Sequence, residues 1–265
     1  MGNRLSTPAP DHHLLWTGGW DSTFQLLRLL IRYREPVTPF YLIDAERAST
    51  GLELRAMKRI KDRLSSQYPH TRALLQPIRY FGADDIAPDR EITEAFVSTC
   101  NKTHIGFQYE WLARFCKQHD LTDMQLCIDA GTSKAYHRIK PFVTQVETPS
   151  RRTYRIDPKH AMTPEYELFR FYTLPVFGLT KLDMVAIAEE QGWDGIMTMT
   201  WFCHHPRADM KPCGRCVACA SVIEEGLGWR IPFSSRIAYA LDRQALDRLR
   251  SSARRFVSRM GAVRP

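Results

Sequence analysis

Long apolar runs are missing from this chain of 265 residues. None approaches the ~20 consecutive apolar residues that a membrane-spanning helix needs, so we expect no membrane segment. The stretch Met1 to Asp11 is polar and contains prolines, and it lacks the apolar centre of a secretory signal. The chain has seven cysteines, which without an export signal favour metal binding or catalysis over disulfides. We therefore expect a cytoplasmic protein.

Acidic residues are in the minority. There are 37 Lys and Arg against 29 Asp and Glu, a formal net charge of +8, and seven arginines stand against one aspartate between Arg243 and Pro265. A basic surface suits anionic ligands such as ATP, nucleic acid or an acidic partner. A solvated helix face explains the same excess more simply and is the interpretation we favour for this tail.

A glycine turn near the start of the chain is its most informative feature. The apolar run His13 to Trp16 predicts a short buried strand, and the apolar spacing from Phe24 to Ile31 predicts a helix. Between them lies the sequence Thr17-Gly18-Gly19-Trp20-Asp21-Ser22-Thr23. Glycines let the backbone approach an anion, and the first helical amides point at the same place. With hydroxyl groups on Thr17, Ser22 and Thr23, the stretch predicts a phosphate-binding loop.

Two common nucleotide-binding signatures are absent from this loop. It lacks the Gly-Lys-Ser/Thr ending of a Walker A loop. It also lacks the third glycine of a dinucleotide fingerprint. A plain glycine turn before a helix is the alternative interpretation.

Strands and helices alternate along the rest of the chain. We expect further strands at Val37–Ile43, Ala73–Tyr80, Met124–Ile128 and Leu174–Phe177, and helices at Leu52–Ser66, Phe107–His119, Lys181–Gln191 and Arg236–Arg250. This order predicts an α/β fold with a parallel sheet of five strands and helices on both faces. In such sheets ligands bind beyond the carboxyl ends of the strands. The glycine loop, Asp44, Gly131 and Lys181 are expected at that edge.

The stretch from Gly131 to Pro164 has no clear periodicity and few acids. We expect a long basic loop, functional or mobile. Its cations could line one anionic pocket with the glycine loop and Lys181, or could simply be solvated: Lys134, Arg138, Lys140, Arg151 and Arg152.

Four cysteines lie within seventeen residues: Cys203, Cys213, Cys216 and Cys219. Cys-x2-Cys spacing lets two sulfurs reach one tetrahedral ion, and four thiolates with no open position are typical of structural zinc. An iron–sulfur cluster also takes four cysteines and stays open as an alternative. His204 and His205 are adjacent candidates. Because the cysteines fill the ligand shell, we place both histidines outside it.

The glycine loop and the cysteine cluster together resemble the 7-cyano-7-deazaguanine synthases, the QueC-type members of the PP-loop ATP pyrophosphatase superfamily. That family opens with Ser-Gly-Gly-x-Asp-Ser, here Thr17 to Ser22, and ends in Pro-Cys-Gly-x-Cys-x2-Cys, here Pro212 to Cys219. Glu53-Leu54, the stretch Pro175 to Lys181 and Thr200 before Cys203 also match. The family's Tyr-Pro-Asp-Cys motif of the deazaguanine pocket is absent, and Phe202 replaces a serine.

The resemblance implies a Rossmann-like, PP-loop (adenine nucleotide alpha hydrolase-like) domain over residues 1–199. It further implies a four-cysteine zinc motif with C-terminal helices over residues 200–265. ATP and Mg²⁺ would bind at Thr17, Gly18, Gly19, Asp21, Ser22, Thr23, Asp44 and Gly131, and Asp21, Ser22 and Lys181 would be catalytic. Zn²⁺ would bind the four cysteines. We also expect a homodimer.

The implied reaction is that of a carbon–nitrogen ligase. A carboxylate such as 7-carboxy-7-deazaguanine attacks the α-phosphate of ATP, pyrophosphate leaves, and ammonia takes the acyl group, with a second round forming a nitrile. The lost pocket motif and the basic loop keep a second hypothesis open, in which the acceptor is a protein terminus or a tRNA base. A non-catalytic nucleotide-binding module is the third.

Overall fold

The computed structural model describes residues 11–147 and 152–241. The chain divides into two compact units, Met1–Phe202 and Cys203–Pro265. The sequence placed this boundary after residue 199. No helix in the described ranges is long and apolar enough to cross a membrane.

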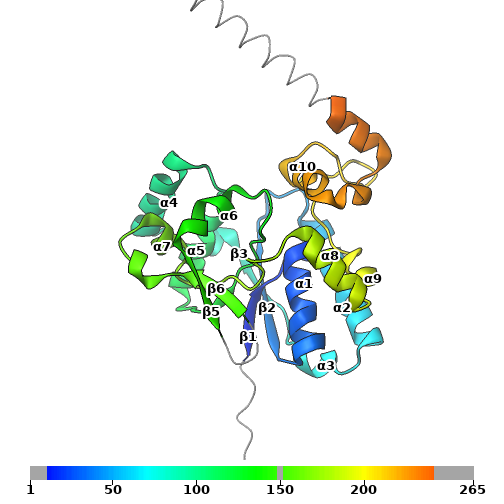
Figure 1. The fold of residues 1–265 in the computed structure, drawn as a ribbon, viewed down its shortest axis with the longest axis horizontal. Helices are drawn as coiled ribbons and strands as arrows, with labels where there is room; N and C mark the ends of the chain where they lie inside the picture. The colour runs from blue at the N-terminus through cyan, green and yellow to red at the C-terminus, as the bar shows by residue number, and fades with distance from the viewer. Residues whose placement is uncertain (1–10, 148–151, 242–265) are drawn as a thin grey trace, which may run out of the picture. The chain divides into compact units, whose positions relative to one another are not determined.

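A parallel sheet of five strands forms the centre of the first unit (Figure 1). Its order is β3-β2-β1-β4-β7, and every neighbouring pair is parallel. The strands are β1 His12–Leu15, β2 Val37–Ile43, β3 Arg79–Gly82, β4 Met124–Gln125 and β7 Tyr172–Thr173. The predicted α/β class with a parallel five-stranded sheet is confirmed. The order reverses between β1 and β4, which is where α/β sheets of this kind place their ligand crevice.

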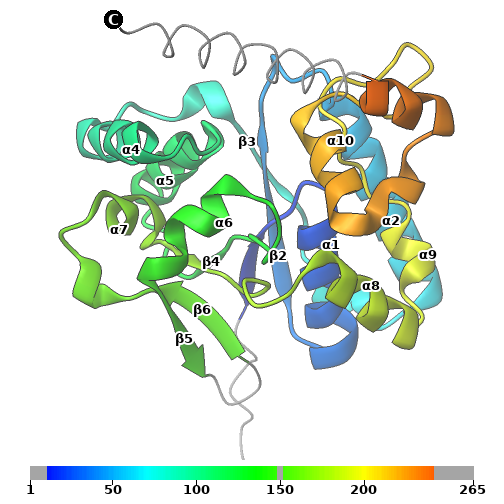
Figure 2. The ribbon, with the colours of Figure 1, turned by 45° about the horizontal axis from the view of Figure 1, so that its top comes forward.

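Helices cover both faces of this sheet, as Figure 2 shows. One face carries α1 Trp20–Leu27, α2 Thr50–Gln67, α3 Thr71–Leu74, α8 Lys181–Glu190 and α9 Asp194–Met197. The other carries α4 Arg90–Lys102, α5 Gln108–Gln118, α6 Lys134–Ile139 and α7 Pro164–Phe169. The inner strand β2 is accordingly buried along nearly its whole length, as expected for a strand covered on both sides. Its Phe40 and Leu42 join the core beneath α4 and α5, while Tyr41 donates to Glu53 of α2.

The remaining elements are short. An antiparallel hairpin pairs β5 Val143–Glu147 with β6 Arg152–Ile156. The second unit contains α10 Val217–Val222 and a helical stretch over 233–241. Turns of π-helix occur at Arg28–Tyr33 and Ile223–Leu227, and 3₁₀ turns at Ala83–Asp85, Lys140–Phe142, Pro158–His160 and Gly228–Arg230.

Two buried hydrogen bonds fix α1 on the sheet. The Trp16 indole donates to the Thr23 hydroxyl at 3.0 Å, and the Gln25 amide donates to Gln125 of β4 at 2.8 Å. Both glutamines are almost fully buried. Since a buried polar group without a partner costs free energy, these pairs define how the helix that begins at the glycine turn sits across β1 and β4.

Two strand predictions were displaced by prolines. Ala73 and Leu74 belong to α3, and the strand begins only at Arg79, after Pro77. Leu174–Phe177 is a turn, in which Phe177 donates to the Leu174 carbonyl at 3.3 Å, and the strand is Tyr172–Thr173. Proline cannot donate to a ladder. The apolar residues around Pro175 are buried all the same, so the hydrophobic signal was correct and the strand assignment wrong.

Two further expectations were wrong. Gly131–Pro164 is not one long loop, because it contains α6 and the β5–β6 hairpin. On α8, Leu182 is exposed while Met184 is buried, so the face toward the sheet is rotated from the predicted one. Residues 242–250 of the expected C-terminal helix, and the arginine-rich tail, lie outside the described residues.

Candidate functional site

The glycine turn is held in a conformation that suits glycine. Gly18 has φ +69°, and a Cβ placed there would lie 2.9 Å from Met57 Cγ and 3.2 Å from the Glu53 carbonyl oxygen. On its other side, the Trp201 amide donates to the Gly18 carbonyl at 2.9 Å. The turn is therefore clamped between α2 and the segment that leads to Phe202, and only a residue without a side chain fits without strain.

The first turn of α1 lacks a side-chain cap among the described residues. Gly19 is the N-cap residue, and no described side chain caps the helix amides. Thr17 is exposed beside it, while Ser22 is 7% exposed. Thr23, predicted to contact the nucleotide, is fully buried and bonded to Trp16. Its placement gives it a packing role, and the uncapped amides around Gly19 are the groups suited to an anion.

Lys181 meets Asp21 across 160 residues of sequence. Its ammonium pairs with Asp21 Oδ1 and lies 3.3 Å from Asp129 Oδ1. The lysine and Asp129 side chains are 9% and 8% exposed, and Asp21 is 23% exposed. The predicted proximity of Asp21 and Lys181 is thus seen in the structure, and Asp129 is the third member of this carboxylate–lysine cluster.

Each member of the cluster follows a different strand. Asp21 comes after β1, Asp129 after β4 and Lys181 after β7. The Ala130 amide donates to the Leu179 carbonyl at 2.8 Å, which joins the last two segments. The cluster therefore stands at the carboxyl edge of the sheet, flanking the β1–β4 reversal. Two carboxylates and one ammonium leave a formal charge of −1, which suits a divalent cation accompanied by phosphates.

The position of Lys181 at the start of α8 opposes the helix dipole. Local capping offsets part of that conflict, because Thr180 and Asp183 form a reciprocal capping box. The Asp183 amide donates to the Thr180 hydroxyl at 3.1 Å and the Thr180 amide donates to Asp183 at 2.8 Å. The helix start is thereby fixed independently of the lysine side chain, which is turned toward the two carboxylates.

A buried phenol and a buried thiol adjoin the cluster. Burial, reinforced by the charges of Asp129 and Asp21, raises the pKa of Tyr109 to about 12. Burial also raises the pKa of Cys127 well above its ordinary value, with Asp21 the next cause. Both groups are therefore protonated at neutral pH. The Cys127 thiol is poorly suited to nucleophilic catalysis, which requires the thiolate.

The other predicted residues are more dispersed. Asp44 follows β2, and its carboxylate accepts from the Glu46 amide at 3.1 Å. Gly131 lies in the bend before α6. Arg138 pairs with the buried Glu165, and the Lys140 ammonium stands 5.4 Å from the Tyr136 ring centroid.

The expected basic pocket is not assembled. Within the described ranges, no hydrogen bond or ion pair joins Lys134, Arg138, Lys140 or Arg152 to the glycine loop, because these residues lie on α6, a 3₁₀ turn and the hairpin. Arg151 lies outside the described residues. Sequence reasoning also did not include Asp129 and Tyr109 among the site residues. The position of Asp129 directly after a predicted strand was the signal that could have found it.

The four predicted cysteines come together in the second unit. Their sulfur atoms all lie within 4.8 Å of one another, with Cys213 and Cys219 sulfurs 3.8 Å apart and Cys216 and Cys203 sulfurs 4.0 Å apart. Four sulfurs about 2.3 Å from a shared Zn²⁺ in a tetrahedron lie about 3.8 Å from one another. The cluster can therefore bind a metal such as zinc. Neither His204 nor His205 belongs to this set.

The backbone around these cysteines supports thiolates. The Arg215 and Cys216 amides donate to Cys213 Sγ at 3.4 and 3.3 Å. A hydrogen bond with Cys219 is the largest cause that lowers the pKa of Cys216 to about 3. Gly214 has φ +77°, and a Cβ there would lie 2.4 Å from the Ser235 carbonyl oxygen, so this turn also requires glycine.

No protein-family model matches this chain, and no curated protein sequence matches it.

The geometry of Gly18 predicts the effect of a single methyl group. Gly18→Ala should destabilise the protein by about 2–4 kcal/mol, because a left-handed alanine and an overpacked Met57 contact each cost free energy. Gly51→Ala is the matched control, since nothing lies within 4 Å of a Cβ there. It should leave stability unchanged or raise it by up to about 1 kcal/mol. Urea unfolding followed by tryptophan fluorescence measures both, and equal stabilities would show that the turn tolerates side chains.

Proposed function

We propose that this chain is an ATP-dependent enzyme that forms AMP and pyrophosphate while activating a carboxylate. The observation that carries the proposal is the carboxylate–lysine cluster of Asp21, Asp129 and Lys181 beside an uncapped helix start at the carboxyl edge of the sheet. A bare glycine turn would need no charged partners. An ammonium held by two carboxylates next to uncapped helix amides supplies both signs of charge that a metal–nucleotide needs.

Each residue has a distinct part in this proposal. The amides that follow Gly19 would bind phosphate oxygens, and Asp21 is the group suited to hold Mg²⁺, which prefers carboxylate and phosphate oxygens. Lys181 would neutralise charge that develops on the leaving pyrophosphate, an effect worth most in a site with little water. Asp129 is a positioning residue that keeps the ammonium at this edge.

The proposed reaction balances through two bond exchanges. A carboxylate oxygen of the acceptor bonds to the α-phosphorus of ATP as the bond to pyrophosphate breaks. Ammonia then bonds to the acyl carbon, AMP leaves with the former carboxylate oxygen, and a proton is released. The resemblance to QueC-type ligases makes 7-carboxy-7-deazaguanine the first acceptor to test, and a second activation of the amide would give the nitrile.

A macromolecular acceptor is the second candidate. The observation that favours it is the altered middle of the chain, where a helix and an exposed hairpin stand in place of the family's pocket motif. Lys134, Lys140 and Arg152 are exposed on these elements. Such residues could contact a protein terminus or a tRNA.

We also propose that the four cysteines hold Zn²⁺ with a structural role. The set supplies four thiolates and leaves no open position, which is the arrangement of structural rather than catalytic zinc. An iron–sulfur cluster would be distinguished by colour and by iron content.

Product analysis tests the ATP chemistry. Wild-type protein with ATP, Mg²⁺ and acceptor should release AMP and pyrophosphate, measured by ion-exchange separation of labelled nucleotides. Asp21→Asn should reduce turnover by at least about 100-fold, the usual effect of removing one charge-stabilising group. The matched control, Asp84→Asn at an exposed carboxylate, should retain activity. Release of ADP and orthophosphate would contradict the proposal.

The lysine is tested by the ATP–pyrophosphate exchange rate. Lys181→Met should lower this rate by ~100-fold or more, because a transition-state donor is lost. Leu182→Ala, the control at the neighbouring exposed position, should exchange normally. Circular dichroism of both variants checks folding, since loss of the ammonium leaves two buried carboxylates together. Exchange at the wild-type rate in folded Lys181→Met would remove the lysine from the mechanism.

Metal analysis tests the cysteine cluster. One zinc per chain is expected by mass spectrometry of the purified protein. Cys216→Ser should lower zinc occupancy and make residues 203–241 sensitive to protease, because metal binding and folding are coupled in such motifs. Cys100→Ser, outside the cluster, should keep its zinc. Iron in place of zinc, or less than about half an equivalent of any metal, would be inconsistent with so closed a site.

A further inference from the structure

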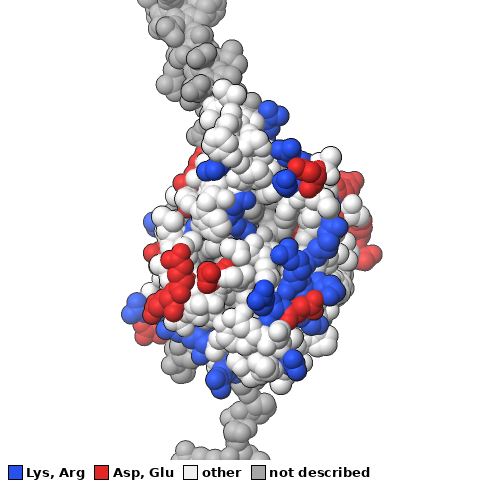
Figure 3. Space-filling model, turned by 90° about the vertical axis from the view of Figure 1, so that its right-hand side faces the viewer, with Lys and Arg blue, Asp and Glu red and all other residues white. Residues whose placement is uncertain are grey.

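The exposed face of α2 is strongly basic. It carries five cationic side chains against the single exposed acid Asp62: Arg55, Lys58, Arg59, Lys61 and Arg63. Asp62 lies 2.7 Å from Lys58, whereas Arg59, Lys61 and Arg63 make no ion pair with other described residues. Figure 3 shows a band of Lys and Arg side chains on the side of the molecule that carries α2.

Folding does not require these cations. The opposite face of α2 packs on the sheet through Ala56, Met57, Ile60 and Leu64, all buried. Arg55, Arg59 and Arg63 follow one another at four-residue intervals, and like charges at that spacing destabilise a helix. A face that served only solubility would gain from alternating signs. The arrangement is accordingly one that an anionic partner would stabilise.

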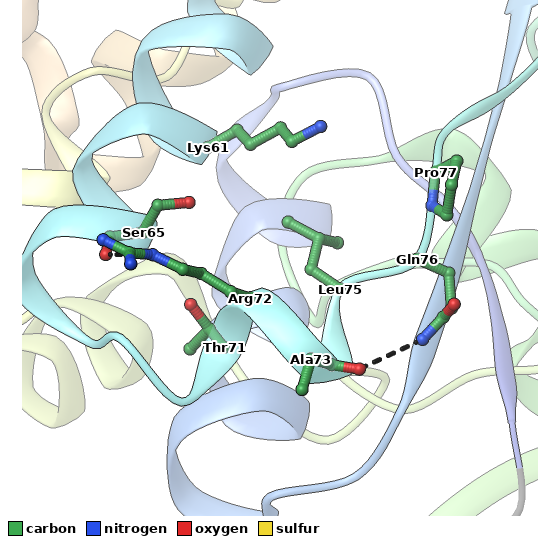
Figure 4. Close-up of a pocket in the computed structure, with 8 residues that line it drawn as sticks. All are labelled: Lys61, Ser65, Thr71, Arg72, Ala73, Leu75, Gln76 and Pro77. Atoms are coloured by element: carbon green, nitrogen blue, oxygen red, sulfur yellow. Dashed lines mark hydrogen bonds between the residues drawn. The ribbon is translucent and has the colours of Figure 1, made fainter.

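A hollow of about 380 Å³ opens beside this face (Figure 4). Its polar lining comes from α2, α3 and the segment that follows: Lys61, Ser65, Thr71, Arg72 and Gln76. Arg72 Nε donates to the Ser65 carbonyl at 3.1 Å, which fixes the guanidinium against α2. Its other N–H groups make no hydrogen bond within the described ranges, and Lys61 extends over the hollow in Figure 4.

We propose that this basic face of α2, together with the Lys61–Arg72 hollow, binds the phosphate backbone of a nucleic acid. Side chains four residues apart on a helix are separated by about 6 Å along its axis, and phosphates of one strand recur about every 3.4 Å along a duplex axis. Arg55, Arg59 and Arg63 can therefore meet alternate phosphates. The hollow offers a fork and an ammonium to a further phosphate.

Composition favours a nucleic acid over an acidic protein. The exposed residues of α2 include no large apolar side chain. Protein interfaces are anchored by buried aromatic and aliphatic groups, whereas phosphate contacts need only cations and hydroxyls. The binding is independent of the ATP chemistry. Because Met57 and Glu53 of the same helix contact the glycine turn, a strand lying along α2 would run toward the carboxyl edge.

The test is fluorescence anisotropy of a fluorescein-labelled RNA hairpin, with a stem of about two helical turns, against the full chain. The triple variant Arg59→Gln, Lys61→Gln, Arg63→Gln should weaken binding by about tenfold or more at moderate salt. It should also lower the slope of log affinity against log salt by about two to three, one unit per phosphate contact. The control triple Arg90→Gln, Lys102→Gln, Lys159→Gln removes the same charge from exposed sites on other elements.

Two results would overturn the proposal. One is equal affinity and equal salt slope for the two triple variants, which would show that the cations of α2 make no backbone contact. The other is displacement of the hairpin by poly-L-glutamate of matched charge at equal concentration, which would show a surface for acidic proteins. ATP turnover by the α2 variant is a separate readout, and its persistence separates this surface from the nucleotide site.

Discussion

The position of one ammonium group organises the candidate site. Lys181 opens α8 after β7, yet its side chain is almost buried between Asp21 and Asp129. Removing a charge from water is costly unless it is paired. The arrangement can persist only if three segments, widely separated in sequence, arrive at the same edge of the sheet. The parallel order β3-β2-β1-β4-β7 meets this condition, and the buried Gln25–Gln125 pair maintains it from below.

The glycine turn depends on the same packing. Gly18 fits against α2 and beneath Trp201 only because it has no side chain, and α1 begins directly after it without a side-chain cap from the described residues. An uncapped, partly buried helix start next to two carboxylates and a lysine is an unfavourable arrangement for stability alone. Such local conflicts are expected where a ligand completes the electrostatics. The cysteine cluster of the second unit differs, because its own turn at Gly214 holds it locally.

The sequence predicted most where hydrophobic pattern and chemistry coincided. β2 was predicted at its observed bounds because a strand covered on both faces is an unbroken apolar run. The four cysteines converge as their spacing indicated, since short spacings and a glycine turn constrain them locally. By contrast, Pro77 and Pro175 turned two apolar runs away from the ladder, and the helix and hairpin between residues 134 and 156 lack a period strong enough to read. Asp129 was missed because its value comes from a contact with Lys181, a tertiary property that no local pattern encodes.

Amide hydrogen exchange with and without Mg·ATP shows whether the glycine turn and the carboxylate–lysine cluster form the nucleotide site. Binding at this edge predicts slower exchange of the amides from Gly19 to Thr23 and at the start of α8, with little change in the β5–β6 hairpin. If ATP binds, as shown by calorimetry, while those amides exchange at unchanged rates, the nucleotide lies elsewhere and this assignment of the site is wrong.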